Sequence, residues 1–183
     1  MPAQKPGQSR QDYETPLDFL HALTDRLQIK TFLFDFAADS RNRKAVKFWD
    51  ETADALSKTP EQWARMTGGP VLGGWGWCNP PYGNIAPWAM RCLETCLCGG
   101  RVAFLVPASV GSNWYRDFIH EQHGVQTLFL NGRLNFVGEN WRELINPKTG
   151  KFYTSEPLYP KDCICVLFGT GKPYAADVWT WKQ

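Results

Sequence analysis

Apolar residues near the start of the chain recur at helical spacing. Leucines lie three or four positions apart between residues 17 and 27, which is the period of an amphipathic helix packed on a core. Thr15 and Pro16 stand just before the first of them, and proline is favoured at the first helical position. We therefore expect a helix with Thr15 as its N-cap.

Continuous apolar runs farther along the chain predict buried strands, and stretches with helical character separate them. The expected strands cover residues 32–36, 45–49, 71–78 and 102–106, followed by VQTLFLNG and DCICVLFGT; expected helical segments cover TADALSK, TPEQWARM and residues 85–98 and 112–123. This alternation predicts an α/β fold, with helices on both faces of a mostly parallel sheet. The last two strands are expected to pair antiparallel.

The boundaries of the domain follow from changes in polarity. Residues 1–12 have no apolar period and predict a disordered tail. At 183 residues the chain has the length of one domain, so we expect residues 13–183 to form a single domain. A polar insert at about 137–162 interrupts it.

Composition and charge exclude only a few classes of protein. A net charge of +2 permits a polyanionic partner without arguing for one. No apolar stretch approaches the roughly 18 residues that cross a membrane, and the polar N-terminus lacks a signal-peptide core, so we expect a cytoplasmic protein. In that reducing setting the six cysteines are expected to be free thiols in or near the core rather than metal ligands.

Ligands of open α/β sheets bind beyond the carboxyl ends of the strands. The first expected strand ends at Asp35 and is followed by Asp39, while a later one ends in the sequence NPPY, and the topology could bring both to one edge. Val166 and Pro173 break the pattern of a phosphate-binding loop, and no G-x-G-x-x-G follows the first strand. A cofactor without a phosphate fits better. The serines and histidines have no hydrolase context.

The residues Asn79, Pro80, Pro81 and Tyr82 suit one reaction. The exocyclic amine of a nucleobase is a poor nucleophile, and the carbonyl groups of Asn79 and Pro80 can accept its N–H bonds. Two prolines hold these carbonyls on a stiff loop, and Tyr82 offers a flat face for a base flipped out of a duplex. A stiff turn with Tyr82 in the core is the alternative interpretation.

With these residues in view, the chain resembles the phage-type DNA N-6-adenine methyltransferases (Dam-like), which are S-adenosylmethionine-dependent enzymes of the Rossmann-like class I fold. The likeness extends from about Tyr13 to Phe168. It rests on an ordered series of motifs: TPLDFLHAL, FDFAADSRNR, DAL, WCNPPYGN, FLVPAS followed by Trp114, and NGRLNFVG.

The resemblance implies roles for individual residues. Asn79 to Tyr82 would form the catalytic loop for the adenine amine. The expected cofactor contacts are Thr15, Pro16, Asp35, Phe36, Ala37, Ala38, Glu51 and Asp54. Ala37 and Ala38 replace the usual glycine-rich loop, Glu51 is preferred over Asp50 for the ribose hydroxyls, and Asp54 would accept from the cofactor's adenine amine. Thr15 as a plain helix cap and Asp54 as a solvated helix start remain alternatives.

The implied reaction is direct methyl transfer to adenine in double-stranded DNA, with no metal and no obligatory protein partner evident. The polar insert is the expected DNA-contacting segment, or else a solvated hairpin; the DNA-binding candidates are Arg133, Arg142, Lys148 and Lys151. Two other functions stay open: a protein-glutamine methyltransferase, which also presents N-P-P-Y to a planar amide, and an inactive DNA-binding relative.

Overall fold

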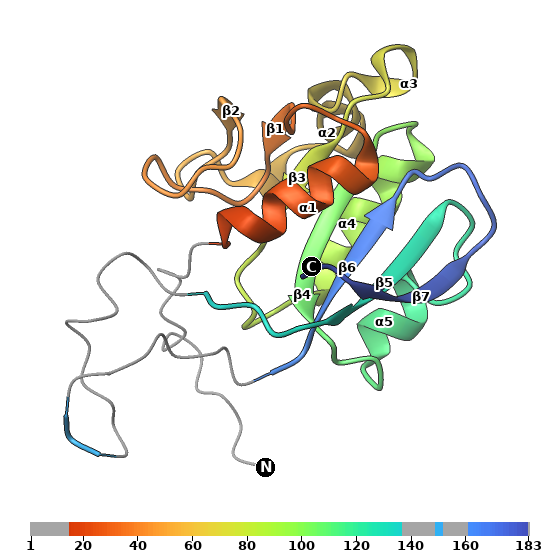
Figure 1. The fold of residues 1–183 in the computed structure, drawn as a ribbon. Coiled ribbons are helices and arrows are strands. Elements are labelled where there is room, and N and C mark those ends of the chain that lie inside the picture. Colours follow the sequence, from red (N-terminus) through yellow and green to blue (C-terminus); the bar gives the residue numbers. More distant parts are fainter. Residues whose placement is uncertain (1–14, 137–148, 152–160, 183) are drawn as a thin grey trace.

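The computed structural model describes residues 15–136, 149–151 and 161–182, and every structural statement below concerns these residues (Figure 1). The predicted disordered tail and most of the polar insert lie outside them. The helical elements are α1 (Leu17–Leu27), η1 (Ala55–Ser57), α2 (Pro60–Met66), α3 (Gly69–Leu72), α4 (Ala86–Leu97) and α5 (Asn113–Phe118). The strands are β1 (Phe34–Asp35), β2 (Lys47–Phe48), β3 (Gly76–Cys78), β4 (Val102–Pro107), β5 (Val125–Asn131), β6 (Cys163–Phe168) and β7 (Ala175–Thr180).

The described strands form one seven-stranded sheet in the order β2-β1-β3-β4-β6-β5-β7. Neighbouring strands from β2 to β4 are parallel, as are β5 and β7, whereas β6 runs antiparallel to both β4 and β5. The expected α/β class with a mostly parallel sheet is therefore confirmed. The predicted antiparallel pairing of VQTLFLNG with DCICVLFGT is confirmed as well.

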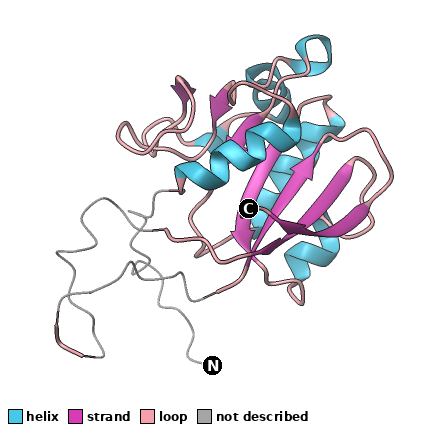
Figure 2. Cartoon of the chain, in the orientation of Figure 1, coloured by secondary structure: helices cyan, strands magenta, loops and turns pink. Residues whose placement is uncertain are grey.

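Helices cover both faces of the sheet (Figure 2). α1 packs on one face, and α2, α4 and α5 pack on the other, so each face has its own apolar core. β4 shows why the central strands read as continuous apolar runs: Val102, Phe104 and Val106 enter one core while Ala103 and Leu105 enter the other. A strand that is buried on both faces does not alternate between apolar and polar residues, so its sequence is a continuous apolar run.

The strand expected over residues 71–78 is only partly correct, because its first part forms α3. Val71 and Leu72 lie in this short helix and are 90% and 78% exposed. Gly68 and Gly73 flank the helix with φ of 81° and 61°, which favours glycine and turns the chain at both ends. β3 starts only at Gly76, where a Cβ would overlap the ring of Phe36.

Three other differences follow from exposure and local turns. β1 and β2 have two residues each, shorter than expected. α5 ends at Phe118 rather than continuing to residue 123, because its C-cap residue Ile119 leaves the helical conformation with φ of −127° and Glu121 then adopts a left-handed φ of 58°. β7 was not expected, since it lies at the sheet edge with a largely exposed burial pattern. α2 begins at Thr59 and Pro60 as expected, with a capping box from Thr59 to Gln62.

Candidate active site at the carboxyl edge of the sheet

Main-chain hydrogen bonds bring the ends of β1, β2 and β3 together. Phe36 donates to the carbonyl of Trp77 at 2.9 Å, and Trp49 donates to the carbonyl of Asp35 at 2.9 Å. The segment FDFAAD therefore lies beside both the start of the NPPY loop and the residues after β2. The expectation that the topology gathers these strand ends at one edge is confirmed.

The side chain of Asn79 is held at both ends of its amide. Its Nδ2 donates to Oγ1 of Thr15 at 3.1 Å, and its Oδ1 accepts from the hydroxyl of Tyr82 at 2.7 Å. Asn79 itself is half-buried, and Thr15 is only 3% exposed. The start of α1 and the loop after β3 thus form one hydrogen-bonded unit across 64 residues of sequence.

The expectation that Thr15 caps α1 is wrong. Pro16 is the N-cap residue, no side chain caps the helix, and the first helical N–H bond runs from Leu20 to the carbonyl of Pro16. The Thr15 hydroxyl accepts from Asn79 instead. Helix periodicity locates the cap region but carries no information about a partner in a loop far away in the sequence, here Asn79 after β3.

Tyr82 connects the NPPY loop to the motif NGRLNFVG, which contains Phe136. Its ring meets the ring of Phe136 edge-on, with centroids 6.4 Å apart and an angle of 77° between the planes. Phe136 is buried at 2% exposure, whereas Tyr82 is half-buried, and Pro80 is buried beside it. The loop therefore combines a fixed amide, two prolines without N–H groups and an aromatic ring supported by the core.

Asp35 is a buried carboxylate whose hydrogen bonds go to its own loop. It is 2% exposed; Oδ1 accepts from the N–H of Ala37 at 3.2 Å, and Oδ2 accepts from the N–H of Lys44 at 2.8 Å. Burial raises the pKa of Asp35 from 3.8 to about 6, since loss of hydration outweighs the hydrogen bonds and the charge of Lys44 that lower it. Asp35 thus shapes the loop that carries Ala37 and Ala38.

The side chain of Phe36 belongs to the apolar core. Its side chain is fully buried and stacks on Trp63, with ring centroids 3.9 Å apart and planes within 9°. A contact from Phe36 to a cofactor would have to come from its main chain.

The three acidic residues after β2 differ in what engages them. Asp50 Oδ1 accepts from the N–H of Ala53 at 2.9 Å, so one of its carboxylate oxygens already has a hydrogen-bond donor within its own turn. Glu51 is exposed, and no described residue binds its carboxylate. Asp54 is also exposed and adopts φ of 46°, a left-handed conformation that non-glycine residues rarely occupy outside functional sites and turns.

The DNA-binding candidates are only partly described. Arg133 pairs with Asp162 at 3.3 Å, and both side chains are exposed. Lys151 is exposed, while Arg142 and Lys148 lie outside the described residues.

Cysteines and other metal-ligating residue types are the remaining candidates for a second site in the described part of the chain. All six cysteines are free thiols, and burial raises the pKa of Cys163 to about 12. In the described ranges, no group of three or more histidine, cysteine or acidic side chains is arranged to hold a metal ion. The same ranges contain no helix with the length and apolar character needed to span a bilayer.

The described sheet, in which β6 runs antiparallel between β4 and β5, and the NPPY loop at its carboxyl edge are consistent with the Rossmann-like fold of class I methyltransferases. The family model for DNA N-6-adenine-methyltransferase (Dam) matches residues 3–157. The chain belongs to this family, and it is an S-adenosylmethionine-dependent DNA adenine-N6 methyltransferase. A comparison with curated proteins gave no match.

Proposed function

We propose that Asn79 and Pro80 hold and polarise the target adenine amine in duplex DNA, after the base has been flipped out against Tyr82. The observation that carries this proposal is the fixed amide of Asn79. Its Nδ2 is bound to Thr15, so its Oδ1 faces the side of the loop where Tyr82 lies. An amide oxygen has two lone pairs and can accept from the Tyr82 hydroxyl and from adenine together.

This arrangement addresses the weakness of the nucleophile. The lone pair of the amine is delocalised into the adenine ring, and two carbonyl acceptors favour a tetrahedral nitrogen that directs the lone pair outward. Because Asn79 and the two prolines are positioned before DNA arrives, little reorganisation is needed during the reaction. Asn79 is too weak a base to keep the proton, so its role is positioning and polarisation.

The residues at the edge fit the cofactor's functional groups. Ala37 and Ala38 leave room for close approach to the main chain, and their loop is fixed through Asp35. The unengaged carboxylate of Glu51 suits the ribose hydroxyls, and Asp54 suits the adenine amine of the cofactor. Thr15 and Pro16 stand where α1 meets Asn79, so a cofactor contact from them would also reach the catalytic loop.

When bound, S-adenosylmethionine supplies an electrophilic methyl group on sulfonium sulfur. Transfer would form an N–C bond at the adenine amine and break the S–CH3 bond, S-adenosylhomocysteine would leave with the electron pair of that bond, and the extra proton of the amine would pass to solvent. The chain's own residues need only align the amine and exclude competing water.

The polar insert and Arg133 complete the proposal on the DNA side. Lys151, Arg142 and Lys148 would contact phosphates, and Arg133 would do so by exchanging its exposed partner Asp162 for a phosphate oxygen. An exposed ion pair contributes little stability, so this exchange costs little.

The test is to incubate the protein with labelled cofactor and, in parallel, unmodified duplex DNA, the same DNA as single strands, and a glutamine-containing peptide. The proposal expects label on adenine N6 with duplex DNA as the preferred substrate. Label on the peptide, or equal rates on single strands, would contradict it.

A further inference from the structure

The segment from Ser40 to Lys47, which ends at the first residue of β2 and is called the basic loop here, carries a concentration of cations, of which Arg41, Arg43 and Lys47 have no role in the site described above. Its sequence SRNRKAVK contains four basic residues and no acidic one. The whole chain has a net charge of only +2, so most of its cations are balanced elsewhere. The basic loop is therefore a local positive surface on a nearly neutral protein.

The basic loop lies beyond the carboxyl end of β1. The carboxylate of Asp35, the last residue of β1, accepts from the N–H of Ala37 where the chain leaves and from that of Lys44 where it returns. The residues between them form an excursion anchored at the same strand end that borders the active site. Figure 1 shows this segment projecting from the fold on the side where α1 begins.

Hydrogen bonds within the excursion give it a defined shape. Asp39 Oδ1 accepts from the N–H groups of Arg41 and Asn42 at 2.6 and 3.1 Å, and Asn42 Oδ1 accepts from the N–H of Asp39 at 2.9 Å. The carboxylate of Asp39 is thus occupied mainly by main-chain donors. A loop fixed in this way loses little conformational entropy when it binds a partner.

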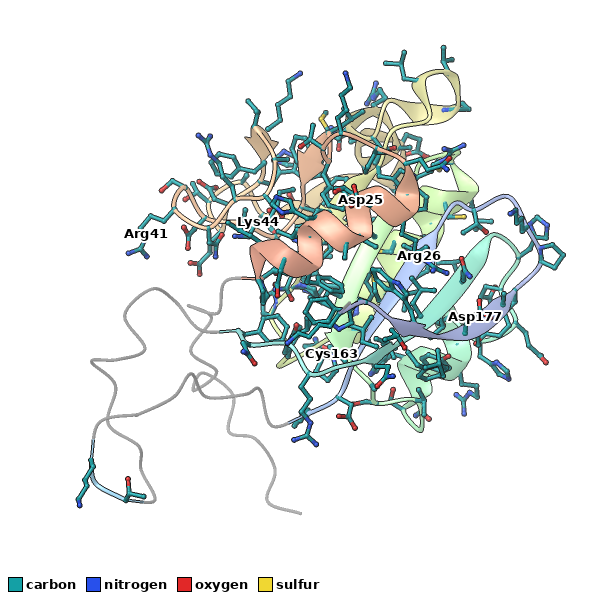
Figure 3. All side chains as sticks on the ribbon, viewed as in Figure 1. Asp25, Arg26, Arg41, Lys44, Cys163 and Asp177 are labelled. Atoms are coloured by element: carbon teal, nitrogen blue, oxygen red, sulfur yellow. The ribbon has the colours of Figure 1, made fainter. Side chains whose placement is uncertain are left out.

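The cationic groups point outward. The side chain of Arg41 is 87% exposed, with Nε 3.8 Å from Asp39, and Figure 3 shows it extending away from the fold. The guanidinium of Arg43 lies 5.4 Å from the centre of the Phe48 ring, and its Nη1 donates to the carbonyl of Val46 at 3.4 Å. That contact orients Arg43 and leaves other N–H groups of the guanidinium for an acceptor. Lys47 is also exposed.

We propose that Arg41, Arg43 and Lys47 bind backbone phosphates of the DNA beside the target adenine. The proposal rests on DNA being the substrate and adds a surface outside the polar insert. Arginine and lysine on a preformed loop are suited to phosphate oxygens, and such contacts fix the register of a protein on a duplex without reading its sequence.

The test compares two variants with the same loss of charge. The loop variant carries Arg41→Gln, Arg43→Gln and Lys47→Gln. The control variant carries Lys30→Gln, Arg65→Gln and Lys172→Gln, which are exposed positions near the amino ends of the parallel strands. Lys44 is left intact because its charge acts on Asp35. Binding of a fluorescent duplex is measured against salt concentration, and binding of S-adenosylmethionine is measured by calorimetry.

Each lost phosphate contact should lower the slope of log K against log salt by about 0.9. We expect the loop variant to lose roughly two to three units of slope and at least about tenfold in affinity near 0.1 M salt, on any duplex sequence. The control should keep the wild-type slope, and both variants should bind the cofactor normally. These readouts do not depend on turnover, so failure of the proposed catalytic roles would leave them unchanged.

Equal slopes for the loop and control variants would overturn the proposal. So would weaker cofactor binding by the loop variant with unchanged DNA affinity, since the basic loop would then serve the cofactor. Circular dichroism and thermal unfolding confirm that both variants are folded before binding is compared.

Discussion

The hydrogen bond between Thr15 and Asn79 joins the residues just before α1 to the NPPY loop, for which we propose the catalytic role, and Thr15→Val tests this link directly. Valine has nearly the shape of threonine but cannot accept a hydrogen bond. Because Thr15 is 3% exposed, water cannot easily replace the missing hydroxyl. The Nδ2 group of Asn79 would then lose the partner that now lies 3.1 Å away.

The size of the effect follows from the net contribution of such a bond, about 0.5–1.5 kcal/mol. If this free energy holds the amide in its reactive orientation, turnover should fall by about 2- to 12-fold, since about 1.4 kcal/mol corresponds to tenfold in rate. The free energy of unfolding should fall by a similar amount, about 1 kcal/mol.

The assay is single-turnover methylation of a saturating duplex, together with the cofactor Kd from calorimetry. Thr15→Ser is the matched control, because it keeps the hydroxyl and should retain most of the rate. A folded Thr15→Val protein with the wild-type rate would refute the reasoning. An unchanged rate with a raised cofactor Kd would show that Thr15 acts on the cofactor instead.

Three further predictions follow. Because burial raises the pKa of Asp35 from 3.8 to about 6, the folded state holds that proton more tightly than the unfolded state, so stability should fall by about 2 kcal/mol as pH rises from 4 to 6.5. Urea unfolding at several pH values should show a smaller decline in Asp35→Asn, and an unchanged decline would exclude Asp35 as its source. Glu51→Gln should raise the cofactor Kd about tenfold, whereas Asp50→Asn should not; equal effects would contradict the assignment. Tyr82→Phe keeps the ring and loses the hydroxyl bond to Asn79, so turnover should fall only a few-fold, while Tyr82→Ala should cost much more; equal losses would count against stacking.

The sequence predicted the parts of the fold that depend on burial. β4 and β6 are apolar throughout because both faces of the sheet are covered, and their runs were identified correctly. β7 was missed because a strand at an exposed edge has no such run. The glycine-rich stretch before β3 misled the prediction, since Val71 and Leu72 are apolar residues on an exposed helix rather than in the core.

In the candidate site, too, the sequence predicted features that follow from residue type and strand order but not contacts between distant residues. The NPPY chemistry and the meeting of two strand ends could be inferred from residue types and the rules of α/β topology. The bond from Thr15 to Asn79 could not, because it joins residues 64 positions apart and depends on how α1 crosses the sheet. The sequence also could not predict that Asp35 anchors the basic loop, because that contact depends on the position of the main-chain N–H of Lys44.

The central claim is that the Asn79 amide polarises the adenine amine. The most direct measurement is the single-turnover rate of N6-methyladenine formation by Asn79→Ala, with DNA and S-adenosylmethionine both saturating and their binding measured separately. Contacts of this kind contribute about 3–4 kcal/mol, so the rate should fall by about two orders of magnitude or more while both ligands still bind. A folded Asn79→Ala protein that forms N6-methyladenine at the wild-type rate would contradict the account.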